Sequence, residues 1–147
     1  MSEASQTIHA TAVALAGRGV LLRGAPGIGK SDLALRLVDG GAMLVADDQT
    51  CLSRRGGEVW AAAPDSLRDL LEVRGVGIVR MPALAEAPVV LVIDLVGEKE
   101  VERCPDPQAE SVLGVELPRL QLNGACASAP AKVRLALRLA AGTGERL

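Results

Sequence analysis

Residues 24–31 read Gly24-Ala25-Pro26-Gly27-Ile28-Gly29-Lys30-Ser31 and match the pattern G-x-x-x-x-G-K-[ST] at every fixed position. In this pattern the glycines let successive backbone N–H groups turn inward, where they and the N-terminus of the following helix form a cradle for phosphate oxygens. Lys30 then brings a positive charge to the β- and γ-phosphates of a nucleotide, and the Ser31 hydroxyl is a ligand for Mg²⁺. The alternative is a glycine-rich turn with an exposed lysine.

The flanks of this stretch favour the phosphate-binding interpretation, because they predict a strand before it and a helix after it. Residues 20–22 are Val-Leu-Leu, a short apolar strand. Residues 31–39 carry apolar side chains at helical spacing and are followed by Gly40-Gly41, which stops a helix. We therefore expect a strand, a glycine loop and a helix in succession.

The rest of the chain mixes short strands with a few helical segments, which is typical of the α/β class. Predicted strands are residues 7–16, turning at Gly17-Arg18-Gly19, residues 43–46, residues 50–52 and 59–61 around a hairpin turn at Arg55-Gly56-Gly57, and residues 88–94. Predicted helical segments are a short piece that starts at Pro64 and contains Leu67, Leu70 and Leu71, and residues 131–141 with Ser128 as a cap.

The composition predicts one globular domain over residues 1–147. A chain of 147 residues has the length of a single domain. Hydrophobic residues make up 49% and charged residues 23%, which excludes a disordered chain. Because the chain has no Phe, no Tyr and only one Trp, its core must be aliphatic.

Charge and aromatic content argue against two classes of partner. A net charge of −2 produces no field that would recruit nucleic acid, and a single Trp leaves no stacking platform for bases. The longest stretch without Asp, Glu, Lys or Arg covers residues 4–17, short of the roughly 18 residues that a membrane-spanning helix needs. We therefore expect a cytoplasmic protein that binds neither nucleic acid nor membrane.

Phosphoryl transfer also needs a group that takes a proton from the acceptor and groups that meet the developing charge. Asp47 and Asp48 follow a predicted strand, at the edge where open α/β sheets bind ligands, so one of them can contact a metal or act as the base. Asp94 competes for the metal role, because an apolar run that ends in Asp is typical of a Walker B strand. The sequence spacing does not separate these aspartates.

Three further polar residues are candidates for the functional site, and each also has an ordinary structural explanation. His9 is the only histidine and lies in a strand of small residues. Glu72 shares one predicted strand face with Arg74, which is either a solvated face or the wall of a site. Arg103 lies in a charged segment that also reads as an exposed loop.

Taken together, four segments resemble the catalytic domain of HPr kinase/phosphorylase, a bifunctional enzyme of bacterial sugar phosphotransferase regulation. They are Ile8-His9-Ala10, residues 24–31, Leu44-Val45-Ala46-Asp47-Asp48 and Leu71-Glu72-Val73-Arg74-Gly75, in the family's order and at close to its spacings. The resemblance implies a P-loop α/β domain with a mixed sheet, related to phosphoenolpyruvate carboxykinase. It also implies a protein-serine kinase that uses ATP and Mg²⁺, together with a reverse reaction in which phosphate attacks phosphoserine and releases pyrophosphate.

The resemblance also implies a role for each matching residue. The loop from Gly24 through Ala25, Pro26, Gly27, Ile28, Gly29 and Lys30 to Ser31 binds the nucleotide. Asp47 is the base for the kinase and the acid for the phosphorylase. Asp48, its hydrogen-bonding neighbour, and Glu72 join Ser31 as metal ligands. His9 lines the phosphate site, and Arg103 resembles the arginine that stabilises the transferring phosphoryl group.

The chain departs from the family's long forms, which carry an extra N-terminal domain, a basic loop longer than residues 81–87, and an Arg-Pro-Gly-Arg-Asn segment not recognisable in residues 122–131. We therefore expect a compact, catalytic-domain-only form of the alphaproteobacterial type that assembles into homo-oligomers. The implied partner is HPr or its nitrogen-related paralogue, and a regulatory sensor protein is the partner expected for the non-catalytic alternative below. Two other functions stay open: a small-metabolite kinase that uses Asp94 for its metal, and a regulator that senses ATP without catalysis.

Overall fold

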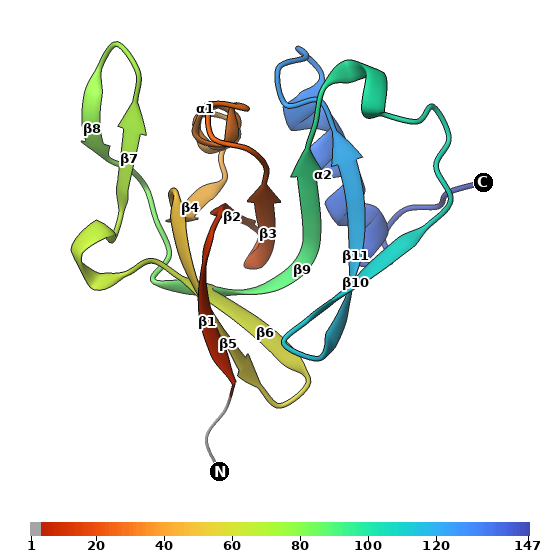
Figure 1. Ribbon diagram of the computed structural model, residues 1–147, viewed down its shortest axis with the longest axis horizontal. Coiled ribbons are helices and arrows are strands. Elements are labelled where there is room, and N and C mark those ends of the chain that lie inside the picture. Colours follow the sequence, from red (N-terminus) through yellow and green to blue (C-terminus); the bar gives the residue numbers. More distant parts are fainter. Residues whose placement is uncertain (1–3) are drawn as a thin grey trace.

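The computed structural model describes residues 4–147 (Figure 1). Its strands are β1 (Ser5–His9), β2 (Thr11–Leu15), β3 (Arg18–Arg23), β4 (Met43–Ala46), β5 (Gln49–Arg55), β6 (Glu58–Ala62), β7 (Leu70–Val73), β8 (Gly77–Arg80), β9 (Glu86–Leu95), β10 (Gln108–Val112) and β11 (Val115–Leu122). Its helices are α1 (Lys30–Asp39) and α2 (Ala129–Ala140), with short 3₁₀ turns at Asp65–Leu67 and Glu98–Glu100. None of the helices within residues 4–147 combines the length and the apolar character needed to cross a membrane.

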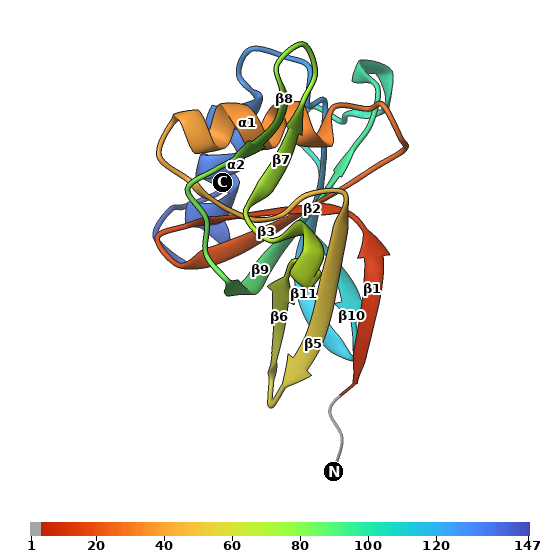
Figure 2. The ribbon, with the colours of Figure 1, turned by 90° about the vertical axis from the view of Figure 1, so that its left-hand side faces the viewer.

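Strand β9 organises a mixed sheet in the order β1-β5-β6-β9-β3-β2-β4, which β10 and β11 extend. It runs parallel to β3 and β11 and antiparallel to β6. The first part of β9 pairs with β6 and its last part with β11, and the sheet curls so that β1, β5 and β6 lie apart from the helices (Figures 1 and 2). A Cβ at Gly19 would lie 2.7 Å from the Pro88 carbonyl oxygen, so only glycine allows β3 this close to β9.

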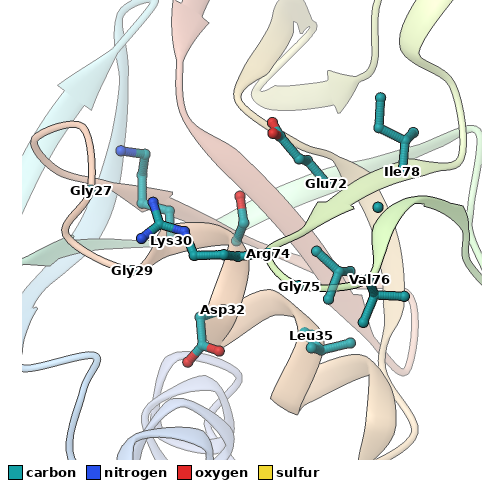
Figure 3. A pocket seen from close by; sticks show the side chains of 13 residues that line it. Gly27, Gly29, Lys30, Asp32, Leu35, Glu72, Arg74, Gly75, Val76 and Ile78 are labelled. Atoms are coloured by element: carbon teal, nitrogen blue, oxygen red, sulfur yellow. The ribbon is translucent and has the colours of Figure 1, made fainter.

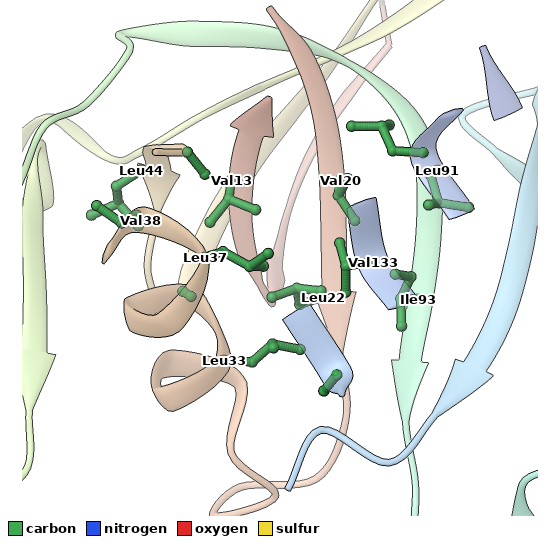
Figure 4. Close-up of a cluster of buried hydrophobic side chains, with 14 of the residues drawn as sticks. Val13, Val20, Leu22, Leu33, Leu37, Val38, Leu44, Leu91, Ile93 and Val133 are labelled. Atoms are coloured by element: carbon green, nitrogen blue, oxygen red, sulfur yellow. The ribbon is translucent and has the colours of Figure 1, made fainter. Parts of the chain in front are cut away.

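Two clusters of buried aliphatic side chains fill the two faces of the sheet, as the composition predicts. Neighbouring residues of β3 alternate between them: Leu22 belongs to the cluster under the helices, and Leu21 belongs to the cluster on the other face. In the first cluster, Leu37 of α1 and Val133 of α2 pack against β2, β3 and β9 (Figure 4). This packing fixes the start of α1 over the edge of the sheet.

The predicted extended run at residues 7–16 is two strands rather than one. It divides at Ala10, because β1 pairs with β5 whereas β2 pairs with β3 and β4. The turn that follows uses Ala16 and Gly17, with φ of 51° and 77°, in place of the predicted Gly17-Arg18-Gly19. Positive φ at both central residues is what a two-residue hairpin turn of type I′ requires.

The predicted helical piece after Pro64 is wrong beyond Leu67. Leu70 and Leu71 belong to β7, because Asp69 turns the chain with a φ of 67° and Leu71 then packs into the cluster under the helices. Ser128 does occupy the position before α2, but its side chain makes no capping hydrogen bond there. Strands β8, β10 and β11 were not predicted.

An ion-pair network links the central strands at the end where β3 leads into residues 24–31. Asp94 accepts hydrogen bonds from Arg23 Nε at 2.7 Å and Arg119 Nε at 2.6 Å, and its side chain is only 17% exposed. Burial raises the pKa of Asp94, but the hydrogen bonds and positive charges of the two arginines outweigh it and hold the pKa below its usual value. Asp94 is therefore charged and fully engaged with Arg23 and Arg119.

We predict that Asp94→Asn lowers the free energy of unfolding at pH 7 by about 1–2 kcal/mol, allowing for partial solvent screening. A lowered pKa stabilises the fold above the ordinary aspartate pKa of about 4, and this stability is lost as the pH falls through the lowered value. The variant should therefore lose less stability than the wild type below pH 4 in urea titrations. Glu86→Gln, which breaks the exposed Arg55–Glu86 pair, is the control and should have a much smaller effect. Equal losses of unfolding free energy in Asp94→Asn and Glu86→Gln would contradict the stabilising role of the Asp94 ion pairs.

Candidate active site

The glycine loop, residues 24–31, connects β3 to α1 and leaves open space in front of its backbone. Gly27 and Gly29 have φ of 81° and 105°, and a Cβ added at either would meet nothing within 4 Å. No side chain caps the first N–H groups of α1, whose preceding residue is Gly29. A phosphate group can therefore approach these N–H groups directly.

Lys30 is the first residue of α1 and folds back under the glycine loop. Its amino group donates hydrogen bonds to the carbonyl oxygens of Gly24 at 2.7 Å and Ala25 at 3.1 Å. The side chain is buried, so the positive charge lies inside the curve of the loop. This position holds the loop in shape and keeps the charge close to any anion bound there.

Asp47 follows β4 and connects three parts of the chain through its buried carboxylate. One oxygen, Oδ1, accepts hydrogen bonds from Ser31 Oγ at 2.6 Å and Thr11 Oγ1 at 3.1 Å. The other, Oδ2, accepts one from the backbone N–H of Glu72 at 3.3 Å. The structure thus brings together Ser31, Asp47 and the Glu72 segment, which lie far apart in the sequence.

A cavity of about 870 Å³ opens beside these residues, within the size range of small-molecule sites (Figure 3). One wall is the glycine loop and the start of α1, including Lys30 and Ser31. The other wall is the β7–β8 hairpin, which lies beside α1 and contributes residues 72–78 (Figures 1 and 2). Glu72 and Arg74 both line it, and the Arg74 side chain extends from the hairpin toward the loop side (Figure 3).

The remaining candidates lie outside the cavity lining. Asp48 is exposed, next to Asp47. His9 is exposed on β1 and pairs in register with Gln49, so it neighbours the Asp47-Asp48 segment. Arg103 is exposed in the connection between β9 and β10. Asp94 is held by Arg23 and Arg119, which leaves no support for it as a metal ligand.

Sequence reasoning missed two residues of this site. The sequence assigns Arg74 no role of its own, but places it beside Glu72 on a predicted strand face and within the segment 71–75 of the family resemblance, and these are the available signals for it. Thr11, which donates to the Asp47 carboxylate, had no signal, because its contact with residue 47 depends on strand pairing.

The residues present fit a nucleoside triphosphate and a magnesium ion. The open glycine backbone, the Lys30 amine and the Ser31 hydroxyl are the groups that bind phosphate oxygens and metal. Among residues 4–147 no group of three His, Cys, Asp or Glu side chains could hold a metal ion alone.

Comparisons with known proteins give relatives of one kind. Residues 2–124 match the family model described as HPr Serine kinase C-terminal domain. The HPr kinase/phosphorylase of Prosthecochloris aestuarii is 36% identical over 129 residues, which cover 80% of this chain and 38% of that protein. The one from Geobacillus thermodenitrificans is 39% identical over 129 residues, covering 78% and 41%. The chain thus spans about two fifths of the length of these relatives.

A solved structure agrees with these matches. The Hpr(Ser) kinase/phosphatase from Coxiella burnetii has a TM-score of 0.82 at 26% identity, with 91% of this chain and 89% of that chain covered. The mixed α/β fold with its curled sheet is therefore shared with that protein. The resemblance expected from four sequence segments is confirmed, and the chain belongs to the HPr serine kinase C-terminal domain family.

Proposed function

We propose that this chain is an ATP-dependent kinase that phosphorylates a serine of the phosphocarrier protein HPr or of its nitrogen-related paralogue. The observation that carries the proposal is the hydrogen bond between Ser31 of the glycine loop and Asp47, beside a cavity, in a chain of this family. It joins a phosphate-binding group to a potential base within one site. We further propose that residues 1–147 form one cytoplasmic P-loop domain related to phosphoenolpyruvate carboxykinase, and that it assembles into homo-oligomers.

In the proposed reaction the phosphates of ATP lie against Gly27, Gly29 and Lys30. Asp47 accepts the proton of the serine hydroxyl as the serine oxygen attacks the γ-phosphorus and ADP leaves. A carboxylate offers about four acceptor positions, and three hydrogen bonds occupy Asp47, so one position remains for the substrate. When bound, Mg²⁺ would offset phosphate charge, with Ser31, Asp48 and Glu72 proposed to hold it. The reverse phosphorylase reaction would use Asp47 to return the proton.

The surface around the cavity supports a protein acceptor over a small metabolite. Val76 and Ile78, at the hairpin side of the cavity, are 74% and 72% exposed. Exposed aliphatic side chains at the edge of a site are typical of contact with another protein. The alternative function, a small-metabolite kinase, requires Asp94 as a metal ligand. The ion pairs of Asp94 with Arg23 and Arg119 argue against this role.

Phosphate transfer to each candidate carrier tests this function. We expect the wild-type chain, incubated with ATP and Mg²⁺, to add one phosphoryl group to a serine of one carrier, located by mass spectrometry. Asp47→Asn should lower the transfer rate about 100-fold or more because the base is lost, while ATP binding measured by calorimetry stays nearly unchanged. Asp39→Asn, at the exposed end of α1, is the matched control and should transfer at the wild-type rate. Wild-type rates in Asp47→Asn would remove Asp47 from the mechanism, and no labelling by the wild type would favour an ATP-sensing regulator.

Arg74 and Arg103 are two candidates for the arginine that stabilises the negative charge of the transferring phosphoryl group. The family resemblance implies Arg103, whereas the cavity lining supports Arg74. We expect Arg74→Gln to lower kcat for transfer about 10- to 100-fold, and Arg103→Gln to change it little, in the same assay. A larger loss in Arg103→Gln than in Arg74→Gln would restore the assignment to Arg103.

A further inference from the structure

We infer that Thr11 is a positioning residue that holds Asp47 and Asp48 in the geometry needed for transfer. The role in transfer rests on the proposed function. Thr11 is the first residue of β2 and is fully buried, between Ala10 and Ala12, which are buried as well. A buried hydroxyl is costly unless it is hydrogen-bonded, and valine would fill nearly the same space without that cost. The contacts of the hydroxyl therefore explain a threonine at this position.

Both contacts of the Thr11 hydroxyl are with the aspartate pair. Oγ1 donates its proton to Asp47 Oδ1 at 3.1 Å and accepts a hydrogen bond from the backbone N–H of Asp48 at 3.2 Å. Since the hydroxyl has only one proton, the amide fixes its direction and aims that proton at the carboxylate. Thr11 thereby couples the backbone of Asp48 to the side chain of Asp47.

The backbone at Asp48 needs such support. Asp48 has a φ of 67°, and the N–H of Gln49 donates to the carbonyl oxygen of Asp47 at 2.7 Å, so the chain makes a tight three-residue turn. A residue other than glycine is strained in this conformation and keeps it only when its surroundings hold it. Ala10 N–H donates to the Asp48 carbonyl oxygen at 3.1 Å, so Ala10 and Thr11 hold the two peptide groups of Asp48.

Loss of the Thr11 hydroxyl should affect turnover rather than nucleotide binding. Neither Thr11 nor Asp47 is among the residues that line the cavity, but Asp47, the proposed base, accepts a hydrogen bond from Ser31, which does line it. A displacement of about 1 Å in a reacting group can slow a reaction on the order of 100-fold. The affinity for ATP depends on the glycine loop, which Thr11 does not contact in any hydrogen bond found here.

The test uses four substitutions in the full chain. Thr11→Val removes the hydroxyl, Thr11→Ser keeps it, and Thr50→Val is the matched control. Thr50 is an equally buried threonine, but its hydroxyl donates to the Ala10 carbonyl oxygen at 2.8 Å and touches neither aspartate. Thr11→Ala is a second hydroxyl-free variant in case the valine variant does not fold. The measurements are kcat and KM for ATP in HPr phosphorylation, and hydrogen exchange of the Asp48 amide by NMR.

We expect Thr11→Val to lower kcat about tenfold or more, with KM for ATP changed less than about twofold and faster exchange of the Asp48 amide. Thr11→Ser should restore kcat, and Thr50→Val should keep both values. Undiminished kcat in folded Thr11→Val, an equal loss in Thr11→Ser, or an equal loss in Thr50→Val would overturn the inference. If the wild type phosphorylates no carrier, the proposed function fails separately. Hydrogen exchange of the Asp48 amide then tests the structural role of Thr11. Faster exchange in Thr11→Val, but not in Thr11→Ser or Thr50→Val, supports that role, and unchanged exchange in Thr11→Val overturns it.

Discussion

The hydrogen bond from Ser31 Oγ to the Asp47 carboxylate joins the start of α1 to the end of β4 at 2.6 Å, and the candidate site is built around it. The order of the strands makes this contact possible. Strand β2 lies between β3 and β4 and runs antiparallel to both, so β3 and β4 end at the same edge of the sheet. The glycine loop leaves β3 at that edge and Asp47 leaves β4 there, on either side of Thr11 at the start of β2.

A buried carboxylate is stable only when hydrogen-bond donors surround it, and each donor of Asp47 comes from a different element. The aliphatic cluster under the helices holds α1 and the Leu71 segment against the sheet. The ion pairs of Asp94 with Arg23 and Arg119 hold the strand that enters the glycine loop. The charged residues at the sheet edge thus divide into a structural set at Asp94 and a candidate catalytic set at Asp47.

Local signals predicted the parts of the site that are contiguous in sequence. The helical spacing of Leu33 and Leu37 predicted α1, and the glycines around Lys30 predicted the loop. The run before Asp47 predicted β4 with its correct bounds, residues 43–46. These elements follow from side-chain period and from glycine conformations, which act over a few residues.

Contacts between distant segments could not be read in this way. Leu70 and Leu71 have a spacing compatible with a helix, but in the structure they pair with β8, and Leu71 packs into the cluster under the helices. Strand β11 contains Pro118 and the exposed Glu116, and its pairing with β10 and β9 is not visible in the sequence. For the same reason the sequence supplied no signal for Thr11, and it does not show that the β7–β8 hairpin brings Arg74 to the cavity.

The proposed function requires that the glycine loop bind the phosphates of a nucleotide through Lys30 in the same site as Asp47. Calorimetric titration of the wild type and of Lys30→Ala with ATP and Mg²⁺ tests it most directly, with Lys132→Ala on the exposed side of α2 as the control. We expect the wild type and Lys132→Ala to bind ATP equally, and Lys30→Ala to bind it at least about tenfold more weakly because a buried phosphate partner is lost. An unchanged dissociation constant in Lys30→Ala would contradict phosphate binding by Lys30 in the glycine loop.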